Sequence, residues 1–371
     1  MSFDVFVSKM KILSVIGARP QFIKTAPISH AILKREKEGA SLREVIVHTG
    51  QHYDENMSEI FFQELEIPEP HYHLGVGSGS HGWQTGQMLE RIEKVLVAEE
   101  PGLVLVYGDT NSTLAGALAA SKLHLPLAHV EAGLRSFNRR MPEEINRLVA
   151  DHLSDLLFCP SQTAVDILAQ EGIRRGVHLV GDIMADSLAL ALTRIDLRSE
   201  ILGRFGLKEH SYLLATIHRA ENTDQPENLR AILTAFQLLN EPILFPVHPR
   251  TRKTLGKLEY SSPANVKMVD PVGYLDMVRL EKDARMILTD SGGIQKEAYW
   301  LGVPCVTLRN ETEWVETVES GWNQLAGAEE EKIIHAVNSF TTPETRPELY
   351  GNGRAAESIL DSLAKSLGIG A

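Results

Sequence analysis

The sequence is poor in the features that mark secreted and membrane-spanning proteins. Only two of its 371 residues are cysteine, and Cys159 and Cys305 both sit in apolar, strand-like runs outside any CxxC pattern. We therefore expect two buried thiols rather than a disulfide framework or a redox pair. No apolar run approaches the ~18 residues that a transmembrane helix needs, and the first nine residues lack the basic start of a signal peptide. These absences predict a cytoplasmic protein with no membrane insertion.

Positive charge is also scarce. Lys and Arg total 37 against 49 Asp and Glu, which gives a formal net charge of −12. Because an acidic chain repels a phosphate backbone at long range, we expect no nucleic-acid partner. A small phosphate-bearing ligand is compatible with this charge only where cations gather locally.

Patterns for a bound cofactor or metal ion are missing as well. The segment 75–79 is rich in glycine, but no clear strand precedes it and no helix opens at it. We interpret it as a flexible loop rather than as a dinucleotide-binding fingerprint. No Walker A sequence is present, and His71 and His73 lack the spacing of helical metal ligands. We therefore expect no cofactor and no metal.

The chain does contain apolar, strand-like runs that alternate with amphipathic segments. In the first half these runs are residues 11–17, 44–50, 103–108, 127–130, 156–159 and 177–181, and in the second half they are residues 212–217, 243–247, 266–269, 285–289 and 304–308. Strands that alternate with helices predict an α/β fold with doubly wound parallel sheets, and this length suits two such cores better than one.

The predicted domains are residues 10–184 and 185–354, with a final helix within 355–371 that joins the first domain. The segment 185–204 shows no clear strand and is expected to link the halves. Two such domains facing each other would form a cleft, and ligands of these sheets bind beyond the carboxyl ends of the strands. The loops after the strands are therefore where candidate site residues are sought.

Loops in the first half carry both cations and acids. Arg19 and Lys24 lie near a predicted helix start and would form an anion site. Asp109, Glu131 and Glu143 each follow a strand or open a helix. Taken singly, Asp109 has the ordinary role of a helix cap and Glu143 that of a first-turn acid. Three carboxylates at one sheet edge instead favour acid–base chemistry or metal binding.

Loops in the second half favour a phosphate-bearing ligand. His218 and Arg219 follow one strand and His248 opens a basic cluster after the next. The turn Ser291-Gly292-Gly293 then leads into a helix, whose exposed N–H groups and dipole suit a phosphate. Glu297 lies about one turn into that helix, where an acid can accept hydrogen bonds from ribose hydroxyls.

As a set, these loops resemble those of the non-hydrolysing UDP-N-acetylglucosamine 2-epimerases, from about Lys11 to about Leu367. The shared segments are 17–24, 49–52, 108–110, 129–135, 142–144, 218–219 and 291–297. The resemblance implies the GT-B fold, with two Rossmann-like domains facing a cleft. It also implies a UDP-sugar substrate, a homodimer and a role in polysaccharide biosynthesis.

The resemblance further implies site residues and a mechanism. The catalytic positions would be Asp109, Glu131, Glu143 and His218, and the positions that bind UDP or substrate would be Arg19, Lys24, Arg135, Arg219, His248, Ser291, Gly292, Gly293 and Glu297. The reaction would be anti elimination of UDP to a 2-acetamidoglucal, reprotonation of the ring on the other face, and re-addition of UDP. The pattern does not assign which carboxylate takes the C2 proton and which group returns it.

Some residues depart from the common bacterial pattern. Trp314 replaces an arginine in the segment 312–316, Lys296 replaces the first acid of a two-acid pair, and Ala220 replaces a second arginine. The residues of the segment 17–24 resemble those found in the branch of this family that epimerises UDP-2,3-diacetamido-2,3-dideoxyglucuronic acid. UDP-N-acetylglucosamine is the first expected substrate and that uronic acid the alternative. A hydrolysing 2-epimerase and a GT-B glycosyltransferase are further alternatives.

Overall fold

The computed structural model describes residues 10–51, 61–258 and 260–367. The chain forms two compact units: unit 1 runs to Leu190 and resumes at Tyr350, and unit 2 is Ala191–Leu349. The predicted boundary between residues 184 and 185 precedes the observed one, which falls inside helix α7 (Ile183–Arg198).

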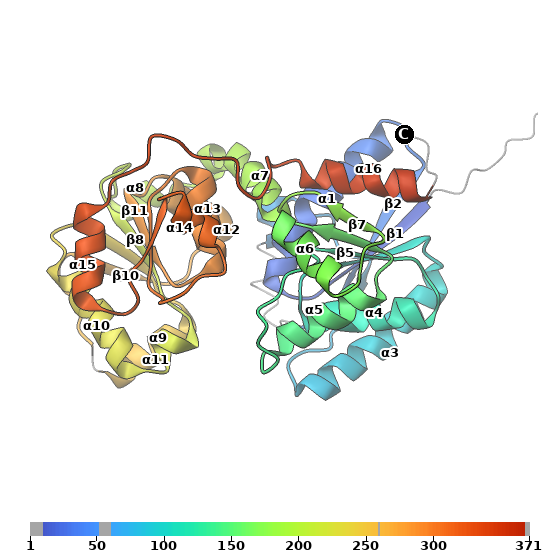
Figure 1. Ribbon diagram of the computed structural model, residues 1–371, viewed down its shortest axis with the longest axis horizontal. Coiled ribbons are helices and arrows are strands. Elements are labelled where there is room, and N and C mark those ends of the chain that lie inside the picture. The colour runs from blue at the N-terminus through green and yellow to red at the C-terminus, as the bar shows by residue number, and fades with distance from the viewer. Residues whose placement is uncertain (1–9, 52–60, 259, 368–371) are drawn as a thin grey trace, which may run out of the picture. The chain divides into compact units, whose positions relative to one another are not determined.

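A parallel sheet forms the centre of unit 1 (Figure 1). Among the described residues its seven strands have the order β3-β2-β1-β4-β5-β6-β7. Their bounds are β1 Met10–Ile16, β2 Leu42–His48, β3 Tyr72–His73, β4 Leu103–Tyr107, β5 Leu127–Val130, β6 Leu156–Cys159 and β7 Val177–Leu179. Residues 12–16 of β1 are wholly buried, as expected of a parallel strand covered on both faces.

Helices cover the sheet of unit 1. Their bounds are α1 Arg19–Lys37, α3 His81–Glu99, α4 Asn111–Lys122, α5 Pro142–Leu153, α6 Gln162–Gln170 and α16 Ala355–Leu367. Apolar side chains of α3, α4 and α5 share one core with β1, β2 and β4. Helix α16 packs against α1 (Figure 1), and Asp186 of α7 accepts hydrogen bonds from its first two N–H groups at 3.0 and 2.8 Å. Helix α16 is thereby fixed to unit 1.

Unit 2 repeats this plan with a smaller sheet. Among the described residues its six strands have the order β10-β9-β8-β11-β12-β13. The strands are β8 Leu213–Thr216, β9 Ile243–Pro246, β10 Val266–Val269, β11 Met286–Thr289, β12 Cys305–Thr307 and β13 Asn323–Leu325, and the helices are α8 Ile201–Phe205, α9 Ala220–Thr223, α10 Pro226–Leu238, α11 Pro249–Lys257, α12 Tyr274–Lys282, α13 Gly292–Leu301, α14 Val315–Glu319 and α15 Glu330–Ser339. One core joins the strands to α10, α11 and α15, and a second joins them to α8, α12 and α13.

Each sheet has one point where the strand order reverses. In unit 1 it lies between β1 and β4, and in unit 2 between β8 and β11. Loops leave the carboxyl ends of two such strands in opposite directions and open a crevice, which is where open α/β sheets bind ligands. The loops that begin at Gly17 and Gly108 therefore meet in unit 1, and those that begin at Ile217 and Asp290 meet in unit 2.

The predicted α/β fold with doubly wound parallel sheets is confirmed in both units, and two details differ. The apolar pattern of the sequence does not predict the short edge strands β3 and β13. Because β3 precedes the segment 75–79, the expectation that no clear strand precedes it is wrong, whereas α3 begins only after the segment, at His81. Val76 N and Gly77 N also donate to the carbonyls of Thr49 and Gly50 at 3.0 and 2.9 Å, so the segment is bound to unit 1.

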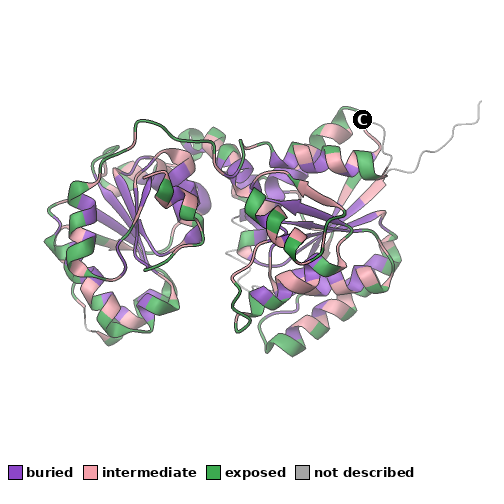
Figure 2. Cartoon of the chain, in the orientation of Figure 1, coloured by how far each residue is buried: buried purple, intermediate pink, exposed green. Residues whose placement is uncertain are grey.

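Burial follows the sheets, and the outer faces of the helices are exposed (Figure 2). Cys159 and Cys305 are buried free thiols, as predicted. The linking segment is helical, in α7 and α8. Among the described helices, none combines the length and the apolar character needed to span a membrane.

Candidate active site

The loop between β1 and α1 is built around a close approach of three chain segments. A side chain at Gly17 would collide with the hydroxyls of Thr49 and Ser112, which lie 2.8 Å apart. Glycine is therefore needed here for space. Gln21 accepts hydrogen bonds from the backbone N–H groups of Gly17 and Ala18 at 2.8 and 3.1 Å. These contacts fix the start of α1 at the switch point of unit 1.

Two predicted cations project from this helix start. The guanidinium carbon of Arg19 lies 4.6 Å from the centroid of the Phe61 ring, and Lys24 forms an ion pair with Glu131. Burial opposes the charge on Lys24, but Glu131 and Asp109 hold the pKa of its ammonium above the ordinary value. Lys24 is thus a half-buried cation that pairs with a carboxylate of this unit.

Asp109 and Glu131 belong to one cluster of four charged groups. Arg147 Nη2 lies 2.5 Å from Asp109 Oδ2. Burial opposes the charge on Arg147 too, and Asp109 and Glu131 both raise its pKa. Lys24 and Arg147 therefore each interact with both acids, and Arg147 Nη1 also forms an ion pair with the buried Glu144 at 3.1 Å. The side chains of Asp109 and Glu131 keep 29% and 12% of their surface exposed, so a ligand can reach them.

The backbone beneath this cluster is unusual. Glu131 has a φ of 71° and Gly108 a φ of 61°. A left-handed backbone at a residue such as glutamate costs about 1–3 kcal/mol and tends to occur at functional sites. A Cβ atom on Gly108 would lie 3.2 Å from both Glu131 Oε2 and Lys24 Nζ. The acid cluster therefore rests directly on the turn that carries Asp109.

Helix α5 presents three charged residues at intervals of four, Glu143, Arg147 and Asp151, which places them on one helix face. Glu143 is exposed in the first turn, where a helix N-terminus stabilises a negative charge. Arg147 contacts Asp109, and Asp151 is buried. The neighbouring Glu144 is buried instead of exposed and accepts hydrogen bonds from the loop that precedes the helix.

Asp109 does not cap helix α4, although a helix cap is the ordinary role of an aspartate in this position. Thr110 caps α4, because its hydroxyl accepts a hydrogen bond from Thr113 N at 3.3 Å. Asp109 is thereby left to pair with Arg147, and Asn146 Nδ2 donates to its carbonyl at 2.8 Å.

Arg135 lies in contacts that do not favour its predicted role in ligand binding. Its side chain is 1% exposed, and its Nη1 donates to Asp151 at 2.6 Å. Its Nε and Nη2 donate to Glu171 at 2.9 and 2.7 Å. Burial opposes its charge, but Glu171 and Asp151 hold the pKa of Arg135 above the ordinary value. These contacts favour a structural role, so we leave Arg135 out of the proposed ligand set.

A buried carboxylate organises the switch point of unit 2. Asp290 follows β11 and is 0% exposed. It accepts hydrogen bonds from the backbone N–H groups of His218 and Arg219 at 3.0 Å each and from Asn222 Nδ2 at 3.0 Å. The segment that follows β8 is thereby held against the end of β11, and the side chains of His218 and Arg219 project from this junction.

His218 and His248 lie together in unit 2. Their ring centroids are 5.6 Å apart, and His218 Nδ1 is 3.3 Å from Asp290. Burial lowers the pKa of His218, and the charges of Arg219 and His248 lower it further against the pull of Asp290. The uncharged form of His218 is therefore favoured. His218 lies in unit 2, which also carries the predicted nucleotide-binding residues His248, Ser291 and Glu297.

The N-terminus of α13 forms a compact cradle. Ser291 is the N-cap, and its hydroxyl accepts a hydrogen bond from Ile294 N at 3.4 Å. A Cβ atom on Gly292 would lie 3.1 Å from Trp314 Nε1 and 3.7 Å from Arg219 Nη2. Glycine therefore lets the helix start approach the indole and the guanidinium closely. Helix N–H groups beside a guanidinium suit a phosphate.

One turn further along α13, Glu297 is 7% exposed. Tyr274 Oη donates to its Oε1 at 3.4 Å. Burial and the charge of Glu297 raise the pKa of the buried Glu281 well above its ordinary value. The neutral form of Glu281 is therefore favoured beside the carboxylate of Glu297.

Two of the three departures from the common bacterial pattern, Lys296 and Trp314, contact each other. Lys296 is 3% exposed, and its Nζ lies 3.9 Å from the centroid of the Trp314 ring and 5.6 Å from that of Trp300. A cation–π pair thus stands where the common pattern has an acid and an arginine. Unit 2 gains a buried cation one turn below its predicted phosphate cradle.

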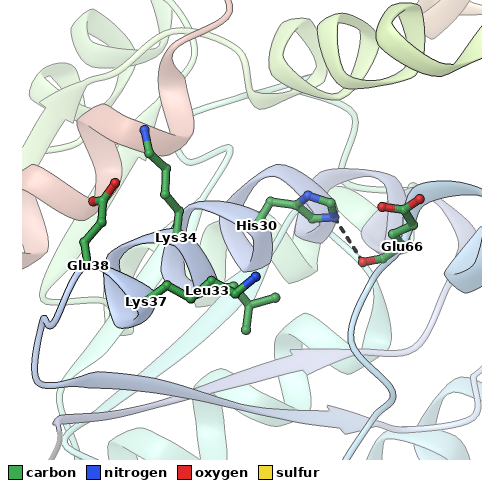
Figure 3. A pocket seen from close by; sticks show the side chains of 6 residues that line it. All are labelled: His30, Leu33, Lys34, Lys37, Glu38 and Glu66. Carbon is green, nitrogen blue, oxygen red and sulfur yellow. Dashed lines mark hydrogen bonds between the residues drawn. The ribbon is translucent and has the colours of Figure 1, made fainter.

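The structure offers two other features to weigh against these loops, a possible metal site and a hollow beside α1. The described residues include no group of three metal-ligating side chains. A cavity of about 540 Å³ opens beside α1 and is lined by His30, Leu33, Lys34, Lys37, Glu38 and Glu66 (Figure 3). None of these lining residues belongs to the acid cluster.

Sequence reasoning missed several residues that build the site. Asp290, Arg147 and Asp151 all hold candidate residues in place, but their partners are distant in the sequence. The four-residue spacing from Glu143 to Arg147 to Asp151 was the signal available for two of them. Asp290 precedes the Ser-Gly-Gly turn directly, so its position in a buried strand end was the signal for the third.

Known proteins resemble this chain over nearly its whole length. A family model described as UDP-N-acetylglucosamine 2-epimerase matches residues 34–364. A UDP-N-acetylglucosamine 2-epimerase homolog from Methanococcus maripaludis is 55% identical over 360 residues, which cover 95% of this chain and 99% of the relative. The UDP-2,3-diacetamido-2,3-dideoxy-D-glucuronate 2-epimerase of Pseudomonas aeruginosa is 50% identical over 364 residues, which cover 96% of this chain and 100% of the relative.

A solved structure adds the fold. The crystal structure of the Methanocaldococcus jannaschii UDP-GlcNAc 2-epimerase in complex with UDP-GlcNAc and UDP is 45% identical. The match covers 96% of this chain and 100% of that one, with a TM-score of 0.85. The predicted GT-B-like architecture is thus shared with an epimerase, and the chain belongs to the UDP-N-acetylglucosamine 2-epimerase family.

Proposed function

We propose that this protein interconverts the C2 epimers of a UDP-2-acetamido sugar without hydrolysing it, with UDP-N-acetylglucosamine and UDP-N-acetylmannosamine as the first expected pair. The observation that carries the proposal is the cluster of Asp109 and Glu131 with Lys24 and Arg147 at the switch point of unit 1. Acids that a ligand can reach, held by half-buried cations, suit proton transfer.

The chemistry explains why such acids are needed. The C2 proton is not next to a carbonyl group, so a base cannot remove it directly. When the C1–O bond to UDP breaks, the developing positive charge at C1 acidifies that proton. One carboxylate takes the proton, and a 2-acetamidoglucal and UDP form. Protonation of C2 on the opposite face and return of the UDP oxygen to C1 complete the epimer. Asp109, Glu131 and Glu143 are the proposed acid–base groups.

The nucleotide requires a different set of groups, which unit 2 supplies. The leaving diphosphate must be held so that it can return to C1. Arg219 and the N–H groups of Gly292 and Gly293 would hold its oxygens, with His218 and His248 beside them. Glu297 would accept hydrogen bonds from the ribose hydroxyls. In unit 1, Arg19 would supply a further anion contact. From the family resemblance we also propose a homodimer that works in the cytoplasm in polysaccharide biosynthesis.

Solvent exchange at C2 tests the proposal directly. With no NAD or metal added, turnover in D₂O should place deuterium at C2 of the sugar, because the removed proton exchanges before the ring is reprotonated. Mass spectrometry and proton NMR of the recovered UDP sugars measure it. Epimerisation that leaves C2 free of deuterium contradicts the elimination route.

The same reaction mixtures separate the other activities. A hydrolysing 2-epimerase would release free N-acetylmannosamine and UDP, and a glycosyltransferase would consume the sugar nucleotide only with an acceptor. Chromatography of the products distinguishes these outcomes from an epimer pair that keeps its UDP.

A second candidate substrate is UDP-2,3-diacetamido-2,3-dideoxyglucuronic acid. The buried cation Lys296 favours it, because that sugar carries a carboxylate that UDP-N-acetylglucosamine lacks. The relative from Pseudomonas aeruginosa with 50% identity, which is named for this substrate, supports the same alternative.

Replacing Lys296 discriminates between the two substrates. If the uronic acid is the substrate, Lys296→Met should lower its kcat/KM about 10-fold more than that of UDP-N-acetylglucosamine, since unit charges about 10 Å apart near a protein surface interact by over 1 kcal/mol. The ratio of the two kcat/KM values is insensitive to general damage. Lys332→Met, which alters an exposed lysine of α15, is the control. An equal loss on both substrates would argue against a carboxylate partner.

A further inference from the structure

His129 is a fully buried histidine that the proposed reaction does not use. It lies in β5, two residues before Glu131, and is 0% exposed. Its Nε2 is 2.7 Å from the carbonyl oxygen of Gly108, and its Nδ1 is 2.7 Å from Asp151 Oδ1. Both ring nitrogens therefore make short contacts with oxygen.

The chemistry of the two oxygens fixes the protons on the ring. A carbonyl oxygen only accepts hydrogen bonds, and an ionised carboxylate only accepts them as well. A neutral imidazole has one bare nitrogen, whose lone pair would face an oxygen at 2.7 Å. With a proton on each nitrogen, His129 donates twice, once to Gly108 and once to Asp151.

The surroundings of Asp151 favour its ionised form, which keeps the second proton on the ring. Besides His129, the carboxylate accepts hydrogen bonds from Gly133 N at 3.1 Å and from Arg135 Nη1 at 2.6 Å. Burial would raise the pKa of Asp151, but His129 and Arg135 outweigh it and hold the pKa below its usual value. Hydrogen bonds to the charged form favour that form.

This pair joins the two turns that carry the proposed acids. On one side, His129 holds the carbonyl of Gly108, and the next residue is Asp109. On the other side, Asp151 holds the N–H group of Gly133, two residues after Glu131. Both turns have left-handed backbone, with φ values of 61° at Gly108 and 71° at Glu131. The buried ion pair of His129 and Asp151, called the clasp below, opposes the relaxation of both turns.

We propose that His129 is a positioning residue, held doubly protonated by Asp151, that fixes the turns bearing Asp109 and Glu131 in the arrangement needed for proton transfer at C2. The inference rests on the proposed function for the role of the two acids. The protonation of the ring and its contacts do not depend on that function.

The first test reads the protons directly and needs no variant. A neutron crystal structure of the perdeuterated wild-type protein at neutral pD should show deuterium on both Nδ1 and Nε2 of His129 and none on Asp151. A ring that carries a single deuterium, or a deuterium on an Asp151 oxygen, overturns the proposal.

The second test measures how the loss of the Asp151 carboxylate affects kcat, KM and the Kd for UDP. Asp151→Asn replaces an acceptor-only group with a neutral amide of the same shape. It should lower kcat for epimerisation by at least about 10-fold, because misplaced reacting groups slow an enzyme on that scale. The Kd for UDP, which depends on unit 2, should change by less than about 2-fold, and so should KM. The control is His152→Gln, an exposed histidine of α5, which should leave kcat unchanged.

Together, these tests distinguish failure of the positioning role from failure of the proposed function. Unchanged kcat in a folded Asp151→Asn protein overturns the positioning role. A loss of kcat that is matched by the same loss of UDP affinity also overturns it, because that result describes a general structural defect. If the wild-type protein exchanges no solvent hydrogen at C2 of either candidate sugar, the proposed function fails, while two deuterium atoms on His129 would still support the clasp.

Discussion

Asp109→Asn and Glu131→Gln are each expected to lower kcat for C2 epimerisation by about 10²-fold or more, the scale of general acid–base catalysis. Each change removes a group that can take or return a proton, and keeps the size of the side chain. Initial rates with saturating UDP sugar, followed by chromatography of both epimers, measure kcat. Glu143→Gln belongs to the same series, because it alters the exposed acid at the start of α5.

The charged residues around these acids also contribute to stability, so a loss of rate can reflect a loss of folded protein as well as of a catalytic group. Removing Glu131 leaves Lys24 without its ion-pair partner, and an unpaired buried charge costs about 3–5 kcal/mol. We therefore expect Glu131→Gln to lower the melting temperature as well. Rates should be normalised to the concentration of UDP-binding protein, which a titration with UDP provides. Glu90→Gln, which alters an exposed acid of α3 paired with Lys94, is the matched control. Near-normal kcat in all three acid variants would mean that these carboxylates are structural.

The fold was predictable because its signal is local and repeated. The run 12–16 is apolar except for Ser14 and is wholly buried, which is typical of a strand covered on both faces. Strand β3 has only two residues, Tyr72 and His73, and neither is fully buried. Its pairing with β2 rather than its own composition makes it a strand. A pattern of hydrophobicity cannot reveal an edge strand whose side chains need not be apolar.

The site was predictable in part for a related reason. Asp109, Glu131 and His218 follow apolar strands, so their position at a sheet edge can be read along the chain. Arg135 also looks like a ligand-binding cation by this criterion, but Asp151 and Glu171 enclose it. Those partners lie 16 and 36 residues away. Which cations are free for a ligand is decided by such tertiary pairs, and a single sequence does not display them.

The nucleotide cradle of unit 2 gives the second large expected effect. Glu297→Ala and Arg219→Met should each weaken UDP binding by about 1.5–3 kcal/mol, or about 10- to 150-fold in Kd, because each removes charged hydrogen bonds to the ligand. Calorimetry with UDP alone measures this without turnover. Matched controls are Glu227→Ala and Arg230→Met, which alter exposed residues of α10 in the same unit.

The two residues should also differ in which part of the nucleotide they recognise. Wild-type protein should bind UDP more tightly than an analogue lacking the ribose hydroxyl that Glu297 accepts from. In Glu297→Ala that difference should disappear, because the lost hydroxyl and the lost carboxylate belong to one interaction. Arg219→Met should keep the difference between the two ribose forms and lose most of the difference between UDP and uridine. Unchanged affinity for UDP in both variants would show that the turn at Ser291 and the helix that follows it do not hold the nucleotide.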